Sequence, residues 1–152
     1  MVNHPADNPL NLRSHGQPPS KITDFLWIGN AYDALDERFV VDNIHEVVLV
    51  GGWHPPLMFP GVAYVHYPLP QPFGTMLPRA QTVVERLQYN HTREIPTLLV
   101  CWGGIDRAPT LALKFLKDCL SMSWARAEAK IKKKRPVAVP HRDWWTGKVK
   151  KK

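Results

Sequence analysis

The sequence lacks three features that define specialised classes of protein. It has no apolar run near the roughly 18 residues of a membrane span, and its longest runs are short, such as residues 47–50. It has only two cysteines in 152 residues, too few for a disulfide scaffold and suited to a reducing compartment. Its first residues carry no apolar stretch of a signal peptide. We therefore expect a cytoplasmic protein without a transmembrane segment, with the nucleus as the alternative location.

Positive charge is abundant, and it is concentrated near the end of the sequence. The whole chain carries a formal net charge of +7. Residues 123–152 contain eleven Lys and Arg against two acidic residues, which gives +9, whereas residues 1–122 contain nine basic and eleven acidic residues, which gives −2. Two interpretations stay open: a solvated face with a frayed end, or a patch that contacts an anionic partner such as nucleic acid, lipid or an acidic protein.

The pattern of apolar residues predicts one domain in which strands and helices alternate. We expect a flexible arm over residues 1–20, a folded domain over residues 21–147 and a basic tail over residues 148–152. Strands are expected at residues 25–28, 46–50, 63–67 and 97–100, and helices at residues 31–43 and 79–89, from about Pro109, and from Ser121 or Ser123 to before Pro136. This alternation predicts an α/β sandwich around one sheet.

Residues 100–110 carry the chemistry, because a predicted strand leads through adjacent glycines into a predicted helix. Glycines let backbone N–H groups turn inward, and such a nest at a helix N-terminus binds anions. Cys101 lies at the base of this nest, an environment that favours a thiolate. Arg107 can place two hydrogen bonds on one phosphate. The segment predicts a nucleophile, an oxyanion cradle and a charge clamp, whereas Cys119 falls on an inner helix face and is expected to be a core thiol.

Residues 101–107 resemble the signature loop of the cysteine-dependent protein tyrosine and dual-specificity phosphatases. Residues 22–36 resemble the opening of dual-specificity phosphatase domains, and Arg135-Pro136 followed by Pro140 resembles their closing segment. The resemblance implies a central, mostly parallel mixed sheet flanked by helices, and no metal or organic cofactor. It also implies that Cys101 attacks phosphorus and that water then hydrolyses the phosphocysteine. The substrate contacts that it implies are Trp102, Gly103, Gly104, Ile105, Ala108 and Gln71.

Three positions depart from the family pattern. Val100 stands where the family usually has His, and Ala108 where it usually has Ser or Thr. The missing hydroxyl predicts slow hydrolysis of the phosphoenzyme, and Arg107-Ala108-Pro109 resembles the sluggish phosphatases of regenerating liver. Gln71 occupies the expected place of the acidic residue that protonates the leaving oxygen, and an amide cannot act as an acid.

Asp106 is the favoured replacement for the missing acid, because its position before Arg107 resembles the loop of the myotubularin lipid phosphatases and of certain bacterial phosphatases. Repulsion from a bound phosphate would raise the pKa of such a carboxyl, as an acid catalyst requires. The alternative is a structural carboxylate that bonds loop amides or Arg107. His66 is an outside candidate, although a histidine in a strand is more often a satisfied core residue.

Three functions remain open. The favoured one is a phosphatase that acts on a phosphorylated substrate, with a phosphoprotein favoured over lipid or RNA. The second is a phosphate-binding module with little turnover, and the third is an RNA 5′-triphosphatase whose basic tail contacts RNA. We also expect Trp144 and Trp145 to clamp the C-terminal segment onto the body, Trp102 to lie beside the cradle, and Trp53 to project toward the pocket. The sequence does not predict the oligomeric state.

Overall fold

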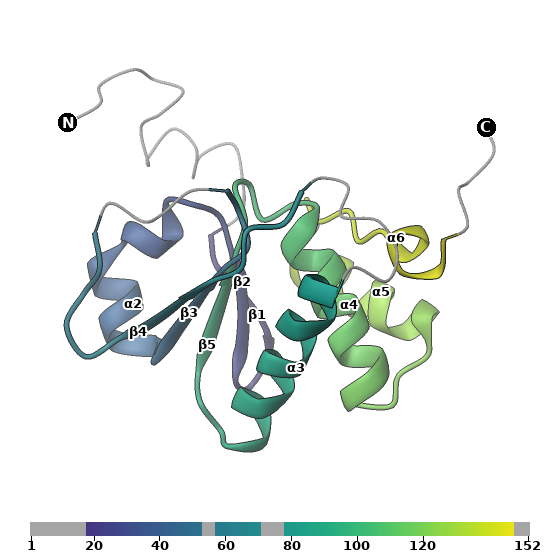
Figure 1. Cartoon of the computed structure of the whole chain (residues 1–152), viewed down its shortest axis with the longest axis horizontal. Helices are drawn as coiled ribbons and strands as arrows, with labels where there is room; N and C mark the ends of the chain where they lie inside the picture. Colours follow the sequence, from purple (N-terminus) through teal and green to yellow (C-terminus); the bar gives the residue numbers. More distant parts are fainter. Residues whose placement is uncertain (1–17, 53–56, 71–77, 148–152) are drawn as a thin grey trace.

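The computed structural model describes residues 18–52, 57–70 and 78–147. These residues contain one five-stranded sheet in the order β1-β2-β5-β3-β4 (Figure 1). Its strands are β1 (Ser20–Thr23), β2 (Leu26–Gly29), β3 (Glu46–Leu49), β4 (Ala63–His66) and β5 (Thr97–Val100). β2, β5, β3 and β4 run parallel, and β1 pairs with β2 in the antiparallel direction at one edge. The expected α/β fold with a mostly parallel mixed sheet is confirmed.

The two central strands explain why the apolar pattern predicted this sheet well. Every residue of β3 and β5 is buried, whereas the edge strand β4 is partly exposed. Parallel strands covered on both faces appear in sequence as continuous apolar runs, so the first and last residues of such strands can be predicted. β5 has the bounds that were expected, β3 and β4 each end one residue earlier than predicted, and β2 begins and ends one residue later.

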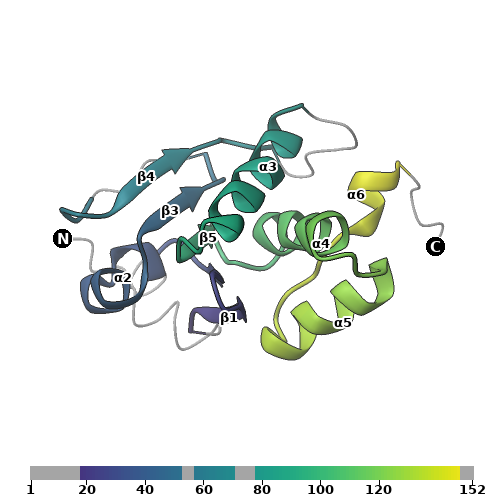
Figure 2. The same ribbon diagram turned by 90° about the horizontal axis from the view of Figure 1, so that it is seen from below.

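Helices cover both faces of the sheet (Figures 1 and 2). Along β3 and β5, Val48 and Leu99 belong to the core beneath one set of helices, and Val47 and Leu98 belong to the core on the opposite face. The helices are η2 (Asp33–Leu35) and α2 (Glu37–Asn43) on the second face, and α3 (Pro78–Thr92), α4 (Arg107–Cys119), α5 (Trp124–Lys134) and α6 (Arg142–Thr146) on the first. None of the helices in the described residues has the length and apolar character to cross a membrane.

Some elements differ from the sequence prediction. The helix expected over residues 31–43 is divided, because Asp36 is extended with ψ 94° and then caps α2 by accepting a hydrogen bond from the Phe39 N–H. Of the two predicted caps of the next-to-last helix, Ser123 is the one observed. β1, which begins at Ser20, and the short helix α6 were not predicted, because each is too short to show an apolar period.

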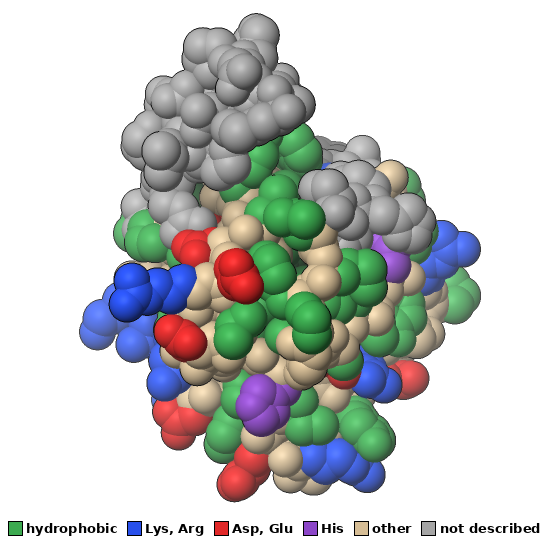
Figure 3. Space-filling model, turned by 90° about the vertical axis from the view of Figure 1, so that its left-hand side faces the viewer, with side chains coloured by type: hydrophobic (Ala, Val, Ile, Leu, Met, Phe, Trp, Pro, Cys, Tyr) green, Lys and Arg blue, Asp and Glu red, His purple; other side chains and the backbone are tan. Residues whose placement is uncertain are grey.

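The surface over α2 and β4 does not carry the positive charge. Hydrophobic and acidic side chains occupy the middle of this face, and Lys and Arg lie mostly at its margins (Figure 3). Within the described residues, exposed Lys132, Lys133 and Lys134 end α5, which lies on the other side of the sheet from α2 (Figure 1). These three lysines therefore lie away from the face over α2.

The carboxyl ends of the parallel strands lie together at one edge of the sheet. Val100, the last residue of β5, is in register with Gly29 of β2 and Leu49 of β3. The chain then enters the loop of residues 101–106 and continues into α4. In open α/β sheets, ligands bind in the crevice beyond these strand ends.

Candidate active site

Cys101 lies directly after β5, at the centre of the carboxyl edge of the sheet. Only 2% of its surface is exposed. The N–H of Ala108, in the first turn of α4, donates a hydrogen bond to the Cys101 Sγ over 3.4 Å. The sulfur thus faces the amino-terminal end of a helix, where backbone N–H groups favour negative charge. This is the placement that the sequence predicted for Cys101.

The loop that follows Cys101 is fixed through its carbonyl groups. The Trp102 carbonyl accepts a hydrogen bond of 2.9 Å from the Ala31 N–H, and the Ile105 carbonyl accepts one of 2.7 Å from the Val139 N–H. In a trans peptide the N–H points opposite to the C=O of the same unit. Carbonyls that bond outward to the scaffold therefore turn the following N–H groups toward the other side of the loop.

Arg135 also donates hydrogen bonds to carbonyl groups of the loop. Its Nε donates to the Gly104 carbonyl over 2.7 Å, and its Nη2 donates to the Gly103 carbonyl over 3.3 Å. Its Nη1 reaches the Ser20 Oγ of β1 over 3.0 Å, so the fully buried side chain joins the loop to the sheet edge. Burial lowers the pKa of the Arg135 guanidinium, and the negative charges of Asp33 and Cys101 oppose this effect.

The donors on the inner side of the loop are available to a ligand. Within the part of the chain that the structure describes, no hydrogen bond occupies the N–H groups of Gly103, Gly104 or Ile105. These amides precede the start of α4 at Arg107. Consecutive backbone N–H groups before a helix form an anion cradle.

Gly104 cannot carry a side chain in this loop. Its φ of +66° lies in the left-handed region. A Cβ would lie 2.5 Å from the Arg135 Nη2 and 2.8 Å from the Gly29 carbonyl oxygen. The loop can therefore pack on the end of β2 and on Arg135 only because this residue is glycine.

Arg107 uses one nitrogen of its guanidinium in a hydrogen bond within the protein, and another has no partner among the described residues. Its Nη1 donates to the Leu69 carbonyl over 2.9 Å. Its Nε is buried and has no hydrogen-bond partner among the described residues. A buried donor without a partner is costly, and its presence at a pocket suggests that a ligand completes it. The predicted two-bond clamp on phosphate stays a prediction.

Asp106 contacts His141, a residue to which the sequence assigned no role. The His141 Nε2 lies 2.8 Å from the Asp106 Oδ1, 35 positions away in the chain. The carboxylate does not cap α4, although Asp106 is the N-cap residue. His141 follows Pro140 in the segment that resembled the family's closing segment, but only the fold brings it beside the loop.

Several contacts hold His141 in place. Its backbone N–H donates to the Thr110 Oγ1 over 2.8 Å. Its ring stacks on Trp144 with centroids 4.2 Å apart and planes 4° apart. The indole Nε1 of Trp145 donates to the Thr110 carbonyl over 2.8 Å. The prediction that Trp144 and Trp145 clamp the C-terminal segment onto the body is confirmed.

The loop surrounds a pocket of about 280 Å³, lined by Cys101, Trp102, Gly103, Ile105, Asp106 and Arg107. Trp102 is 49% exposed at its rim, and its ring lies 5.9 Å from that of Tyr32. Ala108, which the resemblance also implicated, is fully buried against the Cys101 sulfur. The structure thus gathers all predicted loop residues at one site.

The other sequence candidates lie apart or outside the described residues. The His66 Nε2 lies 2.8 Å from the Gly51 carbonyl oxygen, so the ring is engaged by backbone. Cys119 is half-buried against the core, where burial raises the pKa of its thiol. Gln71 and Trp53 fall outside the described residues.

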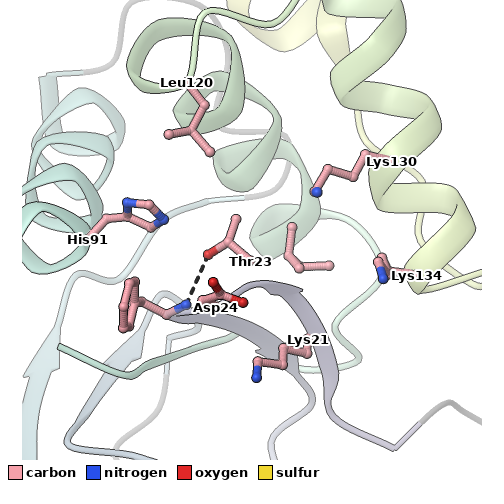
Figure 4. Close-up of a pocket in the computed structure, with 9 residues that line it drawn as sticks. Lys21, Thr23, Asp24, His91, Leu120, Lys130 and Lys134 are labelled. Carbon is pink, nitrogen blue, oxygen red and sulfur yellow. Dashed lines mark hydrogen bonds between the residues drawn. The ribbon is translucent and has the colours of Figure 1, made fainter. Parts of the chain in front are cut away.

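A larger pocket of about 430 Å³ lies between β1, the turn after it, and the ends of α3, α4 and α5 (Figure 4). In that view the ammonium of Lys21 points away from Asp24 and Lys130. The Thr23 hydroxyl is engaged locally, accepting from the Phe25 N–H over 3.2 Å. The polar side chains that line this pocket do not surround one reactive group, whereas the loop after β5 surrounds Cys101. Within the described ranges, no three His, Cys, Asp or Glu side chains gather where they would hold a metal ion.

Comparison with curated proteins gives relatives of one kind. No protein-family model matches the sequence. Human dual specificity protein phosphatase 21 is 27% identical over 128 residues, which span 83% of this chain and 67% of that protein. Rat dual specificity protein phosphatase 18 is also 27% identical over 128 residues, spanning 83% of this chain and 63% of that protein. The chain thus spans about two thirds of the length of these relatives.

Solved structures agree with these relatives. A mouse protein described as a dual specificity phosphatase, in complex with zinc tungstate, aligns with a TM-score of 0.74 and 27% identity over 85% of this chain and 82% of that chain. Human DUSP28 has the same fold, with a TM-score of 0.73 and 22% identity over 85% and 88% of the two chains. In fold and in sequence, the chain therefore resembles the dual-specificity phosphatases of the protein tyrosine phosphatase superfamily.

Proposed function

We propose that the protein hydrolyses phosphate monoesters through a phosphocysteine on Cys101. The observation that carries this proposal is the Cys101 Sγ, which lies 3.4 Å from the Ala108 N–H at the base of a loop whose inner amides are unoccupied among the described residues. A sulfur there can attack phosphorus while the amides hold the phosphoryl oxygens. The relatives named as dual specificity phosphatases support the same chemistry.

In this proposal we assign a residue or a set of loop amides to each step of the reaction. The Cys101 sulfur forms the S–P bond as the bond from phosphorus to the leaving oxygen breaks. The loop amides and the unpartnered Arg107 Nε stabilise the negative charge that develops on the phosphoryl oxygens. Asp106, in the pocket lining, gives a proton to the leaving oxygen and later accepts one from the attacking water. Tungstate, which the mouse relative binds, is like phosphate a tetrahedral oxyanion.

The rim of the pocket favours a phosphoprotein as substrate. Trp102 and Ile105 are 49% and 38% exposed, so the entrance offers apolar surface. An apolar rim fits the ring of a phosphotyrosine or the side chain of a peptide better than a highly charged inositol head group. We expect a higher kcat/KM on a phosphotyrosine peptide than on a soluble inositol phosphate.

The test is an assay of 4-nitrophenyl phosphate hydrolysis with two matched cysteine variants. Cys101→Ser is expected to lower turnover by more than about a thousandfold, because the nucleophile is lost. Cys119→Ser replaces the same atom in the half-buried core thiol and should leave activity near that of the unmodified protein. Acid quenching of the unmodified protein should trap a phosphoryl group on the peptide that contains Cys101. Equal turnover in Cys101→Ser and the unmodified protein would exclude the cysteine mechanism.

A binding module with little turnover is the second candidate, and one observation favours it. The Arg107 Nη1 is already bonded to the Leu69 carbonyl, so the guanidinium must exchange or share this bond to clamp a phosphate with both arms. Val100 and Ala108 point in the same direction, because each lacks a polar group that the family usually has. Phosphate binding that Arg107→Met abolishes, without turnover or a trapped phosphocysteine, would establish this candidate.

The basic tail of residues 148–152, which would suit the RNA 5′-triphosphatase alternative, lies outside the described residues. The pocket itself carries one arginine and no lysine among its lining residues. Salt-sensitive RNA binding that disappears when residues 148–152 are removed would support tail contacts. It would leave the phosphocysteine proposal untouched.

A further inference from the structure

The contact between Asp106 and His141 joins the pocket to the start of α6. Asp106 lines the pocket that also contains Cys101 and Arg107. His141 lies behind it, with Nε2 2.8 Å from the Asp106 Oδ1. The two side chains are only 29% and 25% exposed, so the pair is partly shielded from water.

The imidazole is positioned before any substrate binds. The Thr110 hydroxyl fixes the His141 backbone, and the Trp144 ring stacks against its imidazole with planes 4° apart. Ordering a side chain costs conformational entropy. The imidazole of His141 is already ordered in the folded protein, and it is held facing the Asp106 carboxylate.

We propose that His141 is a positioning residue that keeps a shared proton at the Asp106 carboxyl group, from which the leaving oxygen takes it. This inference rests on the proposed function, because it assumes that Cys101 forms a phosphocysteine. As the S–P bond forms and the P–O bond breaks, the proton passes from the pair to the leaving oxygen. The pair is left as carboxylate and neutral imidazole. As water attacks phosphorus, the pair takes its proton back and the S–P bond breaks.

An imidazole supplies what a carboxyl group alone lacks. Carboxyl groups of aspartic acid ordinarily titrate near pH 4, so one acting alone holds almost no proton at neutral pH. Imidazole ordinarily titrates near pH 6.5. Two hydrogen-bonded groups of these kinds can share one transferable proton. This removes the objection that a carboxylate beside a phosphate only repels it.

The charges around the pair are mixed. The cleft on the His141 side is lined by Glu128 and Lys132 of α5 and by Arg142 and Asp143 of α6. On the pocket side stand Arg107 and the Cys101 sulfur. Charged groups of both signs therefore line the cavity on the His141 side, and an arginine and the cysteine sulfur line the cavity on the Asp106 side.

The test compares two leaving groups in His141→Gln. Phenyl phosphate needs a proton on its leaving oxygen, whereas 4-nitrophenyl phosphate releases a stable phenolate. Glutamine keeps an N–H that can bond Asp106 but holds no transferable proton. We expect kcat/KM, which reports the step that forms the phosphocysteine, to fall roughly tenfold to a hundredfold for phenyl phosphate and less than about threefold for 4-nitrophenyl phosphate. His45→Gln, which removes an exposed imidazole remote from the loop, should change neither rate.

The pH profile gives a second, independent measurement. Activity that depends on the protonated pair is lost as pH rises. Gln removes the imidazole and with it one of the two groups that can hold the proton. In His141→Gln the descending limb of kcat/KM for phenyl phosphate should therefore shift, while the limb for 4-nitrophenyl phosphate stays in place.

Two results would overturn the inference. One is an equal fall on both substrates with unchanged pH limbs, which would make His141 a structural support only. The other is full activity of His141→Gln on phenyl phosphate. Failure of the proposed function is distinguishable: in that case the unmodified protein forms no phosphocysteine and Cys101→Ser matches it on 4-nitrophenyl phosphate. If His141→Gln unfolds, Trp144→Leu, which removes the ring stacked on His141, must reproduce the selective loss on phenyl phosphate, and no selective loss there would also overturn the inference.

Discussion

Two carboxyl side chains, each bonded to a nitrogen-bearing side chain, lie at opposite ends of the parallel strands. Glu46, the first residue of β3, is 3% exposed and accepts hydrogen bonds of 2.8 Å from the Arg86 Nε and the Asn90 Nδ2. Asp106, beyond the carboxyl end of β5, has a 29% exposed side chain paired with His141. Glu46 is buried between α3 and the sheet, whereas Asp106 lines a pocket.

The difference lies in the partner of the carboxyl group, which in our proposal gives the first pair a role in stability and the second a role in chemistry. Burial raises the pKa of Glu46, but hydrogen bonds from Arg86 and Asn90 and the charge of Arg86 outweigh it, so the pKa is lowered. Glu46 is thus held as a carboxylate and its charge does not change near neutral pH. Asp106 is paired with an imidazole, which unlike a guanidinium can lose its proton. The partner decides whether the carboxylate is fixed or able to exchange a proton.

Arg135 does not fit a simple division between a stability end and a functional end, because it is a buried charge that supports the structure of the loop at the functional end. We expect Arg135→Leu to destabilise the protein by about 3–5 kcal/mol and to lower turnover more than about a thousandfold. The reason is that the Gly103 and Gly104 carbonyls and the Ser20 hydroxyl lose their buried donor. Urea unfolding and 4-nitrophenyl phosphate hydrolysis measure the two effects.

Arg135→Lys separates charge from geometry. Lysine keeps the positive charge but cannot bond two adjacent carbonyls in a fixed plane. We expect it to recover part of the stability and little of the activity. Full activity in Arg135→Lys would show that the charge alone organises the loop.

Glu46→Gln tests the stability end. We expect a loss of about 2 kcal/mol at pH 7 in urea unfolding, because charge-assisted hydrogen bonds are lost, with kcat on 4-nitrophenyl phosphate unchanged. Because the pKa of Glu46 is lowered below its ordinary 4.5 in the folded protein, the stabilisation is complete above that value and is lost as pH falls through the lowered pKa. The difference between the unmodified protein and Glu46→Gln should therefore shrink on acidification. A difference that stays constant to pH 3 would contradict the assignment.

Asp106→Asn tests the functional end with the same carboxylate-to-amide change. We expect turnover of phenyl phosphate to fall roughly a hundredfold, because the amide cannot donate a proton as an acid. One limb of the pH–rate curve should disappear. The change in unfolding free energy should stay within about 1 kcal/mol, because both side chains of the pair are partly exposed. A loss of stability as large as that of Glu46→Gln, with an unchanged pH profile, would make Asp106 structural.

The sequence predicted the sheet and the loop because both depend on local patterns. Buried strands such as β5 appear as apolar runs, and Cys101, the glycines and Arg107 lie within one short segment. Their roles follow from local chemistry, namely a strand end, a glycine turn and a helix start. The resemblance to phosphatases extended this interpretation to the ends of the domain.

What the sequence missed depends on contacts between distant segments. His141 meets Asp106 across 35 positions, and the Arg135 Nη1 meets Ser20 across 115. Neither pairing leaves a periodic signal, because a polar side chain in a short connecting segment has no preferred partner until the fold is known. The helix expected over residues 31–43 failed for a related reason. Asp36 caps a new helix inside a run that looked continuous.

Ala108→Ser gives the smallest expected effect and sharpens the comparison at the sulfur itself. Ala108 is fully buried with its N–H on the Cys101 Sγ, so a serine hydroxyl would be placed close to the thiolate that leaves phosphorus in the second step. We expect phosphocysteine hydrolysis to accelerate roughly threefold to tenfold. In rapid-quench experiments with 4-nitrophenyl phosphate, the burst should shrink as the steady-state rate rises. Ala112→Ser, one turn along α4 and equally buried, is the matched control for adding a buried hydroxyl. If both variants change the steady-state rate alike, the effect comes from packing in α4, and the hydroxyl has no role at the sulfur.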